Sequence, residues 1–162
     1  MPTTYSNLLF HIVFSTKERR KLLFKELQNR LFPYLSGIAN KNNFKILISG
    51  GTNDHIHILL SLKPDTPVSK AVQLAKGGSS KWIHDNFSDL NIFSWQEGYG
   101  AFTVSVSQIE KIKNYIANQE EHHKKMGFEE EYLELLKRNN IEFDPKYLFR
   151  FLKPQSQPSL RD

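Results

Sequence analysis

The chain has 162 residues, and its 39% hydrophobic and 12% aromatic content is enough to bury the core of one ordinary domain. It contains no cysteine, which excludes disulfide bonds, thiolate metal sites and cysteine nucleophiles. The formal net charge of +5 favours a polyanionic partner, nucleic acid before membrane.

The first half of the chain follows the pattern strand, helix, strand, strand. Residues 5–15 are aromatic and aliphatic without a helix breaker, which predicts a buried strand. Residues 24–39 place apolar side chains three or four positions apart, as in an amphipathic helix that Pro33 can kink. Two strand-like runs follow at residues 44–49 and 55–62, and the Gly-Gly-Thr-Asn-Asp segment between them suits a hairpin loop.

The second half predicts a helix, a strand and further helices. Residues 69–87 have a helical pattern with a weak point at two adjacent glycines, and residues 92–106 are β-branched and aromatic, as in a strand with a bulge. Ser107 and Glu110 have capping-box spacing, which predicts the start of a helix that Gly127 ends. Residues 129–138 predict one more short helix.

The order strand, helix, strand, strand, helix, strand is that of ferredoxin-like and RRM-like split β-α-β folds. We therefore predict one α+β domain over residues 1–153, with an antiparallel sheet, helices on one face and extra C-terminal helices, and a flexible tail at residues 154–162. The sequence has no run of about 18 apolar residues, and residues 1–6 lack signal-peptide features, so we expect a cytoplasmic protein without a membrane span.

Two histidines one residue apart, His55 and His57, begin the strand predicted at residues 55–62. Because side chains alternate along a strand, both histidines share one face, whereas the intervening apolar residues must face the core. The two imidazoles would lie about 7 Å apart at Cα, near enough to bind one metal ion. The simpler alternative is a polar, half-exposed strand end without function.

The helix after the fourth strand supplies a second pair of polar residues. Tyr115 and Gln119 are four positions apart and share one helix face, so a phenol and an amide are presented together. Taken alone, the pair is better explained as polar surface residues. His122 and His123 near the expected helix end are explained by interaction with the helix dipole, and His11 is most simply structural or exposed.

Together these residues resemble a known family. His55-Ile56-His57 resembles the HUH motif, two histidines around a hydrophobic residue, and Tyr115 with Gln119 resembles the Tyr-x-x-x-Gln motif of single-tyrosine HUH transposases. This family includes insertion-sequence and REP-associated tyrosine transposases, and the resemblance extends from the first strand to Tyr147. Other segments that resemble it are HIVFSTKERR at 11–20, GGTNDHIHILL at 50–60, KGGSSKWI at 76–83, WQEGYGAFTVS at 95–105 and YIANQEEHH at 115–123.

The resemblance implies a DNA transposase that cleaves and rejoins single-stranded DNA. Tyr115 would be the nucleophile that forms a 5′-phosphotyrosine intermediate, and His55, His57 and Gln119 would hold one divalent ion, Mg²⁺ or Mn²⁺. The implied partners are single-stranded DNA with subterminal hairpins and a second copy of the chain. The motifs leave open whether Tyr115 serves the histidines of its own chain or of the partner, and they identify no base for the tyrosine proton.

The densest group of basic residues follows the first strand and comprises Lys17, Arg19, Arg20 and Lys21, which we expect to contact DNA phosphates. A solvated turn is the alternative for this group.

Three other functions fit parts of the pattern. A non-catalytic RRM-like module that binds single-stranded nucleic acid would show an aromatic signature that the chain lacks, and would not need Tyr115 and Gln119. A metal-dependent hydrolase would need carboxylate ligands besides Asp54, which points to the other face of the strand if the strand already starts there. A domesticated relative that processes chromosomal repeats would share the active site.

Overall fold

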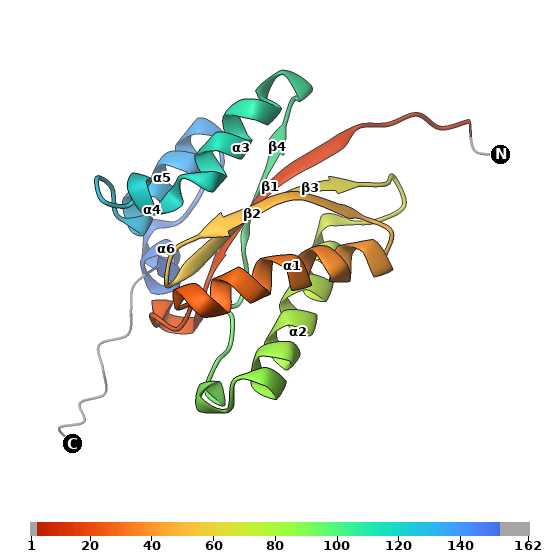
Figure 1. Ribbon diagram of the computed structural model, residues 1–162. Helices are drawn as coiled ribbons and strands as arrows, with labels where there is room; N and C mark the ends of the chain where they lie inside the picture. The colour runs from red at the N-terminus through yellow and green to blue at the C-terminus, as the bar shows by residue number, and fades with distance from the viewer. Residues whose placement is uncertain (1–2, 153–162) are drawn as a thin grey trace.

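Within residues 3–152, which the computed structural model describes, four strands form one antiparallel sheet (Figure 1). β1 pairs with both β3 and β4, and β2 pairs with β3, giving the spatial order β2-β3-β1-β4. This is the order of a ferredoxin-like split β-α-β fold and confirms the predicted α+β class. The strands are β1 (Leu8–Ser15), β2 (Lys45–Gly51), β3 (His55–Leu62) and β4 (Gly100–Val104).

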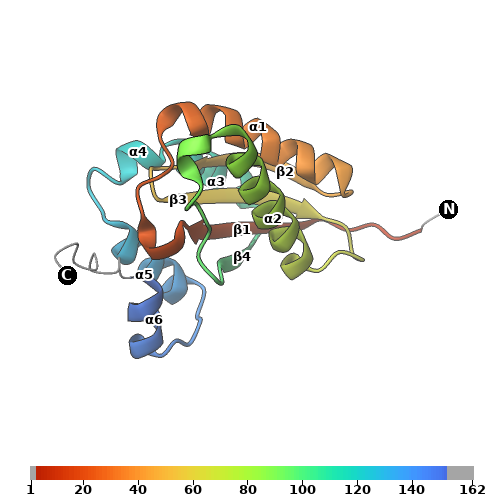
Figure 2. The same ribbon diagram turned by 90° about the horizontal axis from the view of Figure 1, so that it is seen from below.

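Two long helices cover one face of the sheet (Figure 2). The main hydrophobic core lies between them and the strands, and it includes Ile12 and Phe14 of β1 and Ile56 and Ile58 of β3. The first of these helices continues through Pro33 and ends at Lys41, beyond the predicted end at residue 39. The helices are α1 (Lys25–Lys41) and α2 (Val68–Asn86).

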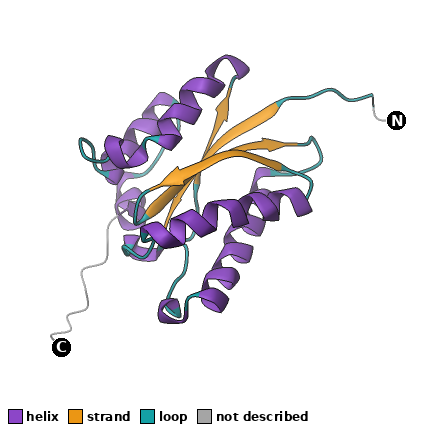
Figure 3. Cartoon of the chain, in the orientation of Figure 1, coloured by secondary structure: helices purple, strands orange, loops and turns teal. Residues whose placement is uncertain are grey.

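Shorter helices cover the opposite face of the sheet (Figure 3). A second, smaller core joins Val13 of β1 and Phe102 of β4 to Phe128 and Tyr132 of α5. Extra C-terminal helices were predicted, and α5 agrees with the helix predicted at residues 129–138. No helix was predicted at the position of α6. The helices are α3 (Ile109–Ala117), α4 (Gln119–His122), α5 (Phe128–Arg138) and α6 (Pro145–Leu152).

The fourth strand is much shorter than the predicted range 92–106, because only β4 belongs to the sheet. Upstream of it, Trp95 forms an isolated antiparallel bridge with Thr16, and its indole N–H donates to the Ser79 hydroxyl at 2.9 Å. Phe93 and Trp95 belong to the main core. The aromatic composition of this segment therefore reflects burial rather than strand pairing, which explains the error.

The predicted capping box is wrong. Ser107 lies inside the 3₁₀ turn η3, its hydroxyl is 3.0 Å from that of Ser105, and Gln108 is the N-cap residue of α3. The predicted helix is also interrupted at Asn118, whose side-chain amide donates to the Asn114 carbonyl at 2.8 Å. Such local side-chain bonds compete with the helical backbone pattern. The 3₁₀ turns are η1 (Lys17–Arg19), η2 (Ser88–Leu90) and η3 (Val106–Gln108).

The expected tail at residues 154–162 lies outside the described residues. Among residues 3–152, no helix combines the length and apolar character that crossing a membrane would require.

Candidate functional site

His55 and His57 lie on the face of β3 that the shorter helices cover, as the alternation of side chains predicted. Both are fully buried, so the alternative of a half-exposed strand end is wrong. The apolar residues between and after them, Ile56 and Ile58, pack into the main core on the other side of the sheet. The sheet therefore separates a hydrophobic layer from a polar one.

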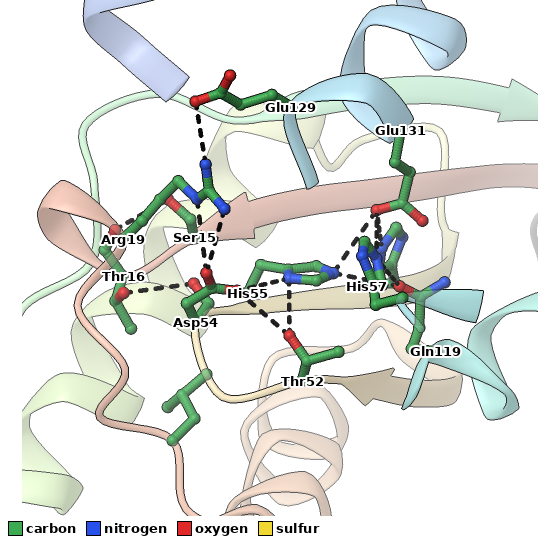
Figure 4. A network of polar contacts seen from close by, with 12 residues as sticks. Ser15, Thr16, Arg19, Thr52, Asp54, His55, His57, Gln119, Glu129 and Glu131 are labelled. Atoms are coloured by element: carbon green, nitrogen blue, oxygen red, sulfur yellow. Dashed lines mark hydrogen bonds and ion pairs between the residues drawn. The ribbon is translucent and has the colours of Figure 1, made fainter. Parts of the chain in front are cut away.

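The imidazole of His55 is held by polar groups from the β2–β3 turn (Figure 4). Its Nδ1 lies 2.9 Å from the Asp54 carboxylate and 3.0 Å from the Thr52 hydroxyl. Burial opposes ionisation of Asp54, but the hydrogen bond with His55 and the charge of Arg19 lower the pKa of Asp54. Asp54 was expected to point to the other face only if the strand already began there. β3 begins at His55, and the Asp54 side chain turns toward that histidine. The contact leaves Nε2 of His55 facing the protein interior.

His57 is held in a similar way by His11. Nδ1 of His57 lies 2.8 Å from Nε2 of His11, and both side chains are buried. Burial lowers the pKa of His57 to about 4 and that of His11 to about 3, so both rings are neutral near pH 7. Neutral imidazole is the form that binds metal ions. His11 was expected to be structural or exposed, and its burial against His57 agrees with the structural alternative.

Gln119 reaches the histidine pair from α4, so the structure brings together the three residues expected to hold an ion. Its side-chain carbonyl oxygen lies 3.1 Å from Nε2 of His55 and 3.0 Å from Nε2 of His123. The side chain is almost completely buried, with 1% exposure. Its helix is separate from that of Tyr115, yet its amide donates to the Tyr115 carbonyl at 3.2 Å.

Glu131 of α5 is the residue that the sequence interpretation missed. Its Oε1 lies 3.0 Å from Nε2 of His123, 3.2 Å from Nε2 of His57 and 3.6 Å from Nε2 of His55. The ligand atoms of these four residues all lie within 4.8 Å of one another. Burial opposes ionisation, but hydrogen bonds from His123 and His57 hold the pKa of Glu131 below its usual range.

A sequence signal for Glu131 does exist. It lies three residues after Phe128 and four before Leu135, on the stripe of α5 that packs against the sheet. A carboxylate on such a stripe needs a partner. No comparable signal singles out His123, whose position near a helix end has a simple electrostatic explanation.

Tyr115 of α3 completes the site within the same chain. Its hydroxyl donates to Oε2 of Glu131 and lies 3.5 Å from Nε2 of His122, which itself lies 3.2 Å from Oε2. Its ring centroid is 5.6 Å from that of His57. Burial and the negative charge of Glu131 raise the pKa of Tyr115 above its usual value, so the resting side chain is a protonated phenol.

Residues 4–119 match the family model of IS200-like transposases. The chain therefore belongs to the IS200-like transposase family. The transposases of insertion sequence IS200 from Salmonella typhimurium and Salmonella typhi are each 34% identical over 123 residues, which cover 73% of this chain and 80% of theirs. The ISDra2 transposase TnpA of Deinococcus radiodurans is 28% identical over 119 residues, which cover 69% of this chain and 84% of that protein.

Solved structures agree with the IS200-like assignment. A candidate transposase from Deinococcus radiodurans R1 superposes with a TM-score of 0.61 at 27% identity, covering 74% of this chain and 95% of that one. A REP-associated tyrosine transposase bound to a REP hairpin shares the fold, with a TM-score of 0.52 at 16% identity over 72% of this chain and 68% of that one. The family assignment thus confirms the prediction of a transposase.

The IS200-like match ends at Gln119, the last of the residues expected at the site. His55, His57 and Tyr115 lie inside the matched region, whereas His123 and Glu131 lie beyond it. Two residues from beyond the matched region, His123 and Glu131, thus lie in one cluster with His55 and His57.

The four basic residues expected to contact DNA differ in their surroundings. The guanidinium of Arg19 is turned inward, 3.2 Å from Glu129 and 3.5 Å from Asp54, and Arg20 pairs with Glu18 at 3.4 Å. Lys17 and Lys21 are exposed. A groove of about 500 Å³ runs from Lys21 to His123, and its lining also includes Phe24, Lys25, Lys124 and Phe128.

Proposed function

We propose that this transposase cleaves and rejoins single-stranded DNA through a covalent 5′-phosphotyrosine linkage at Tyr115, with one divalent ion, Mg²⁺ or Mn²⁺, at His55, His57 and Gln119. The observation that carries the proposal is the Glu131 carboxylate, which contacts Nε2 of His57 through one oxygen and the Tyr115 hydroxyl through the other. Nucleophile and metal-ligating nitrogens are therefore adjacent within one chain.

The residues present fit a divalent ion, because buried imidazoles and an amide oxygen are established ligands for such ions. A bound ion would act as a Lewis acid on the scissile phosphate and stabilise the leaving 3′-oxygen. Among the chain's own residues, His11 and Asp54 orient the two ligating imidazoles. The short helices above the sheet exclude water from the buried nitrogens.

The covalent step exchanges one phosphate ester for another. The Tyr115 oxygen attacks the scissile phosphorus, the bond to the 3′-oxygen breaks, and the DNA strand leaves with a free 3′-hydroxyl. The phenol loses its proton to solvent and the leaving 3′-oxygen takes one up, so the protons balance over the step. Glu131, whose pKa is held low, positions the phenol through the hydrogen bond that its Oε2 accepts. Attack of a 3′-hydroxyl on the phosphotyrosine reverses the step and rejoins DNA without ATP.

We further propose that DNA reaches the site along the groove beside His123, with Lys21 and Lys124 contacting phosphates. A DNA hairpin is the proposed substrate feature, since a structural neighbour binds a REP hairpin. A homodimer would supply two sites for the two ends of an element.

The decisive experiment detects the covalent linkage directly. The protein is incubated with single-stranded oligonucleotides that carry candidate element ends, with Mn²⁺, Mg²⁺ or EDTA, and analysed on denaturing gels. We expect a metal-dependent adduct that survives SDS, and peptide mass spectrometry should place the nucleotide on Tyr115. DNA binding without any adduct, for substrates that include the natural ends, would contradict the proposal.

Lys21→Ala should weaken DNA binding by severalfold and lower the slope of log K against log salt by about 1, while the melting temperature stays unchanged. Arg19→Ala should behave differently, because it removes the cation beside buried Asp54 and should destabilise the protein by about 2 kcal/mol. Fluorescence anisotropy at several salt concentrations and thermal unfolding measure the two effects. An unchanged salt slope for Lys21→Ala would remove Lys21 from the DNA path.

A further inference from the structure

We propose that the divalent ion of this transposase is held by two additional ligands, His123 and Glu131, and that this enlarged set favours a first-row transition ion such as Mn²⁺ over Mg²⁺. The inference rests on the proposed function in that it concerns the same ion. It adds residues from beyond the region that matches the IS200-like family.

Five ligand atoms from three parts of the chain converge. Nε2 of His55 and His57 comes from β3, the amide oxygen of Gln119 from α4, Nε2 of His123 from the end of α4, and Oε1 of Glu131 from α5. The amide oxygen of Gln119 lies 3.1 Å from Nε2 of His55 and 3.0 Å from Nε2 of His123. Oε1 of Glu131 lies 3.6 Å and 3.0 Å from the same two nitrogens. The four groups other than the amide lie within 4.8 Å of one another.

Hydrogen bonding alone accounts poorly for this convergence. A neutral imidazole carries one proton, and Nδ1 of His55 already faces the carboxylate of Asp54, which accepts it. Nε2 of His55 then has no proton for the oxygens of Gln119 and Glu131 that it faces. Nε2 of His123 faces two acceptors at once, the oxygens of Gln119 and Glu131, both at 3.0 Å. Several imidazole nitrogens and two oxygen acceptors around one point are the arrangement of ligands around a cation.

Burial strengthens this conclusion. Glu131 has 2% exposure, and the side chain of His123 has 12%. An isolated carboxylate at such a depth is costly, and ligation of a cation is one of the few arrangements that compensate it. Asp54 and His11 behind the two strand histidines are the outer partners that metal-ligating imidazoles commonly have.

The chemistry of the ligands determines the preferred ion. Mg²⁺ favours oxygen ligands and retained water, whereas imidazole suits first-row transition ions. A site with three imidazoles, one carboxylate and one amide oxygen supplies five protein ligands. It therefore leaves fewer positions for the waters that Mg²⁺ retains, and it contains one more imidazole than the set of two imidazoles and an amide. Glu131 also holds the Tyr115 hydroxyl with its second oxygen, so the same carboxylate positions both the ion and the nucleophile.

Metal titration without DNA tests the proposal separately from strand cleavage. Isothermal titration calorimetry with Mn²⁺ and with Mg²⁺ is performed on the wild-type protein, Glu131→Gln, His123→Asn and Glu130→Gln. Glu130 lies on the same helix one residue earlier and is exposed, so it is the matched control. We expect about tenfold or weaker Mn²⁺ binding for Glu131→Gln and His123→Asn, and wild-type affinity for Glu130→Gln. Wild-type Mn²⁺ affinity in both site variants would overturn the proposal.

A second measurement needs no variant and is therefore independent of folding defects. X-ray absorption spectroscopy of the Mn²⁺-loaded wild-type protein counts the coordinated imidazoles, and we expect three. A count of two would overturn the proposal even if the tyrosine adduct forms. If the enlarged metal site is found but no adduct forms on natural ends, the proposed function fails and the metal site stands.

Discussion

Tyr115→Phe is expected to abolish the covalent protein–DNA adduct while leaving the fold and DNA binding close to those of the wild type. The substitution removes the oxygen that we propose forms the phosphate ester, and we expect at least about a 10³-fold loss of strand cleavage. The aromatic ring keeps its packing against His57 and His11, with centroids 5.6 and 6.0 Å away. The lost hydrogen bond to Glu131 should cost about 1–2 kcal/mol of stability.

Tyr34→Phe is the matched control for this prediction. Tyr34 lies on α1, stacked on Trp82 with ring centroids 4.8 Å apart, on the other side of the sheet from the site. It should form the adduct at the wild-type rate. Denaturing gels measure adduct formation, anisotropy measures DNA binding, and circular dichroism measures the fold. An adduct formed by Tyr115→Phe would show that another residue is the nucleophile.

Much of the fold was predictable because it depends on local patterns. Alternation in β3 separated the core-facing Ile56 and Ile58 from His55 and His57, and the spacing of apolar residues located α1 and α2. These patterns reflect burial, which a sequence displays directly. The same rule produced the error at residues 92–106, because buried aromatic residues outside a sheet have the same composition as a strand.

The site was predictable only in part, because half of it depends on contacts between distant segments. His55, His57, Tyr115 and Gln119 were found through short motifs, each within one element or adjacent elements. Glu131 is 74 residues away from His57 in sequence, and it joins these residues only because α5 folds back over β1 and β4. No local pattern encodes that meeting, although a carboxylate on the apolar stripe of α5 marks Glu131 as unusual.

For Arg19, the local sequence pattern predicted one kind of contact and the structure shows another. A cluster of basic residues predicted a surface for phosphates, but the guanidinium of Arg19 contacts Asp54 and Glu129. It thereby links η1, the β2–β3 turn and α5, so its charge supports the site from behind. Lys21, two positions later, lines the groove, and its contact with DNA phosphates stays a prediction.

Gly50→Ala is the second substitution for which we expect a large effect, and its reason lies in the approach of α3 to β2. Gly50 and its neighbour Gly51 were expected in a hairpin loop, but both belong to β2. A Cβ added at Gly50 would overlap the carbonyl oxygen of Ile116 and lie 3.1 Å from its Cγ2. Because the obstacle is backbone, α3 itself must move, and Tyr115 is the residue next to Ile116.

We expect Gly50→Ala to destabilise the protein by about 3 kcal/mol and to reduce adduct formation by about 10²-fold, since a displacement of about 1 Å at a nucleophile can have such an effect. Gly37→Ala is the matched control, because nothing lies within 4 Å of the added methyl group and Gly37 is inside α1. That variant should be more stable by about 0.5–1 kcal/mol and fully active. Urea unfolding and adduct kinetics measure both quantities. If Gly50→Ala is as stable and active as Gly37→Ala, contact between β2 and α3 does not position the tyrosine, and Glu131 alone must hold it.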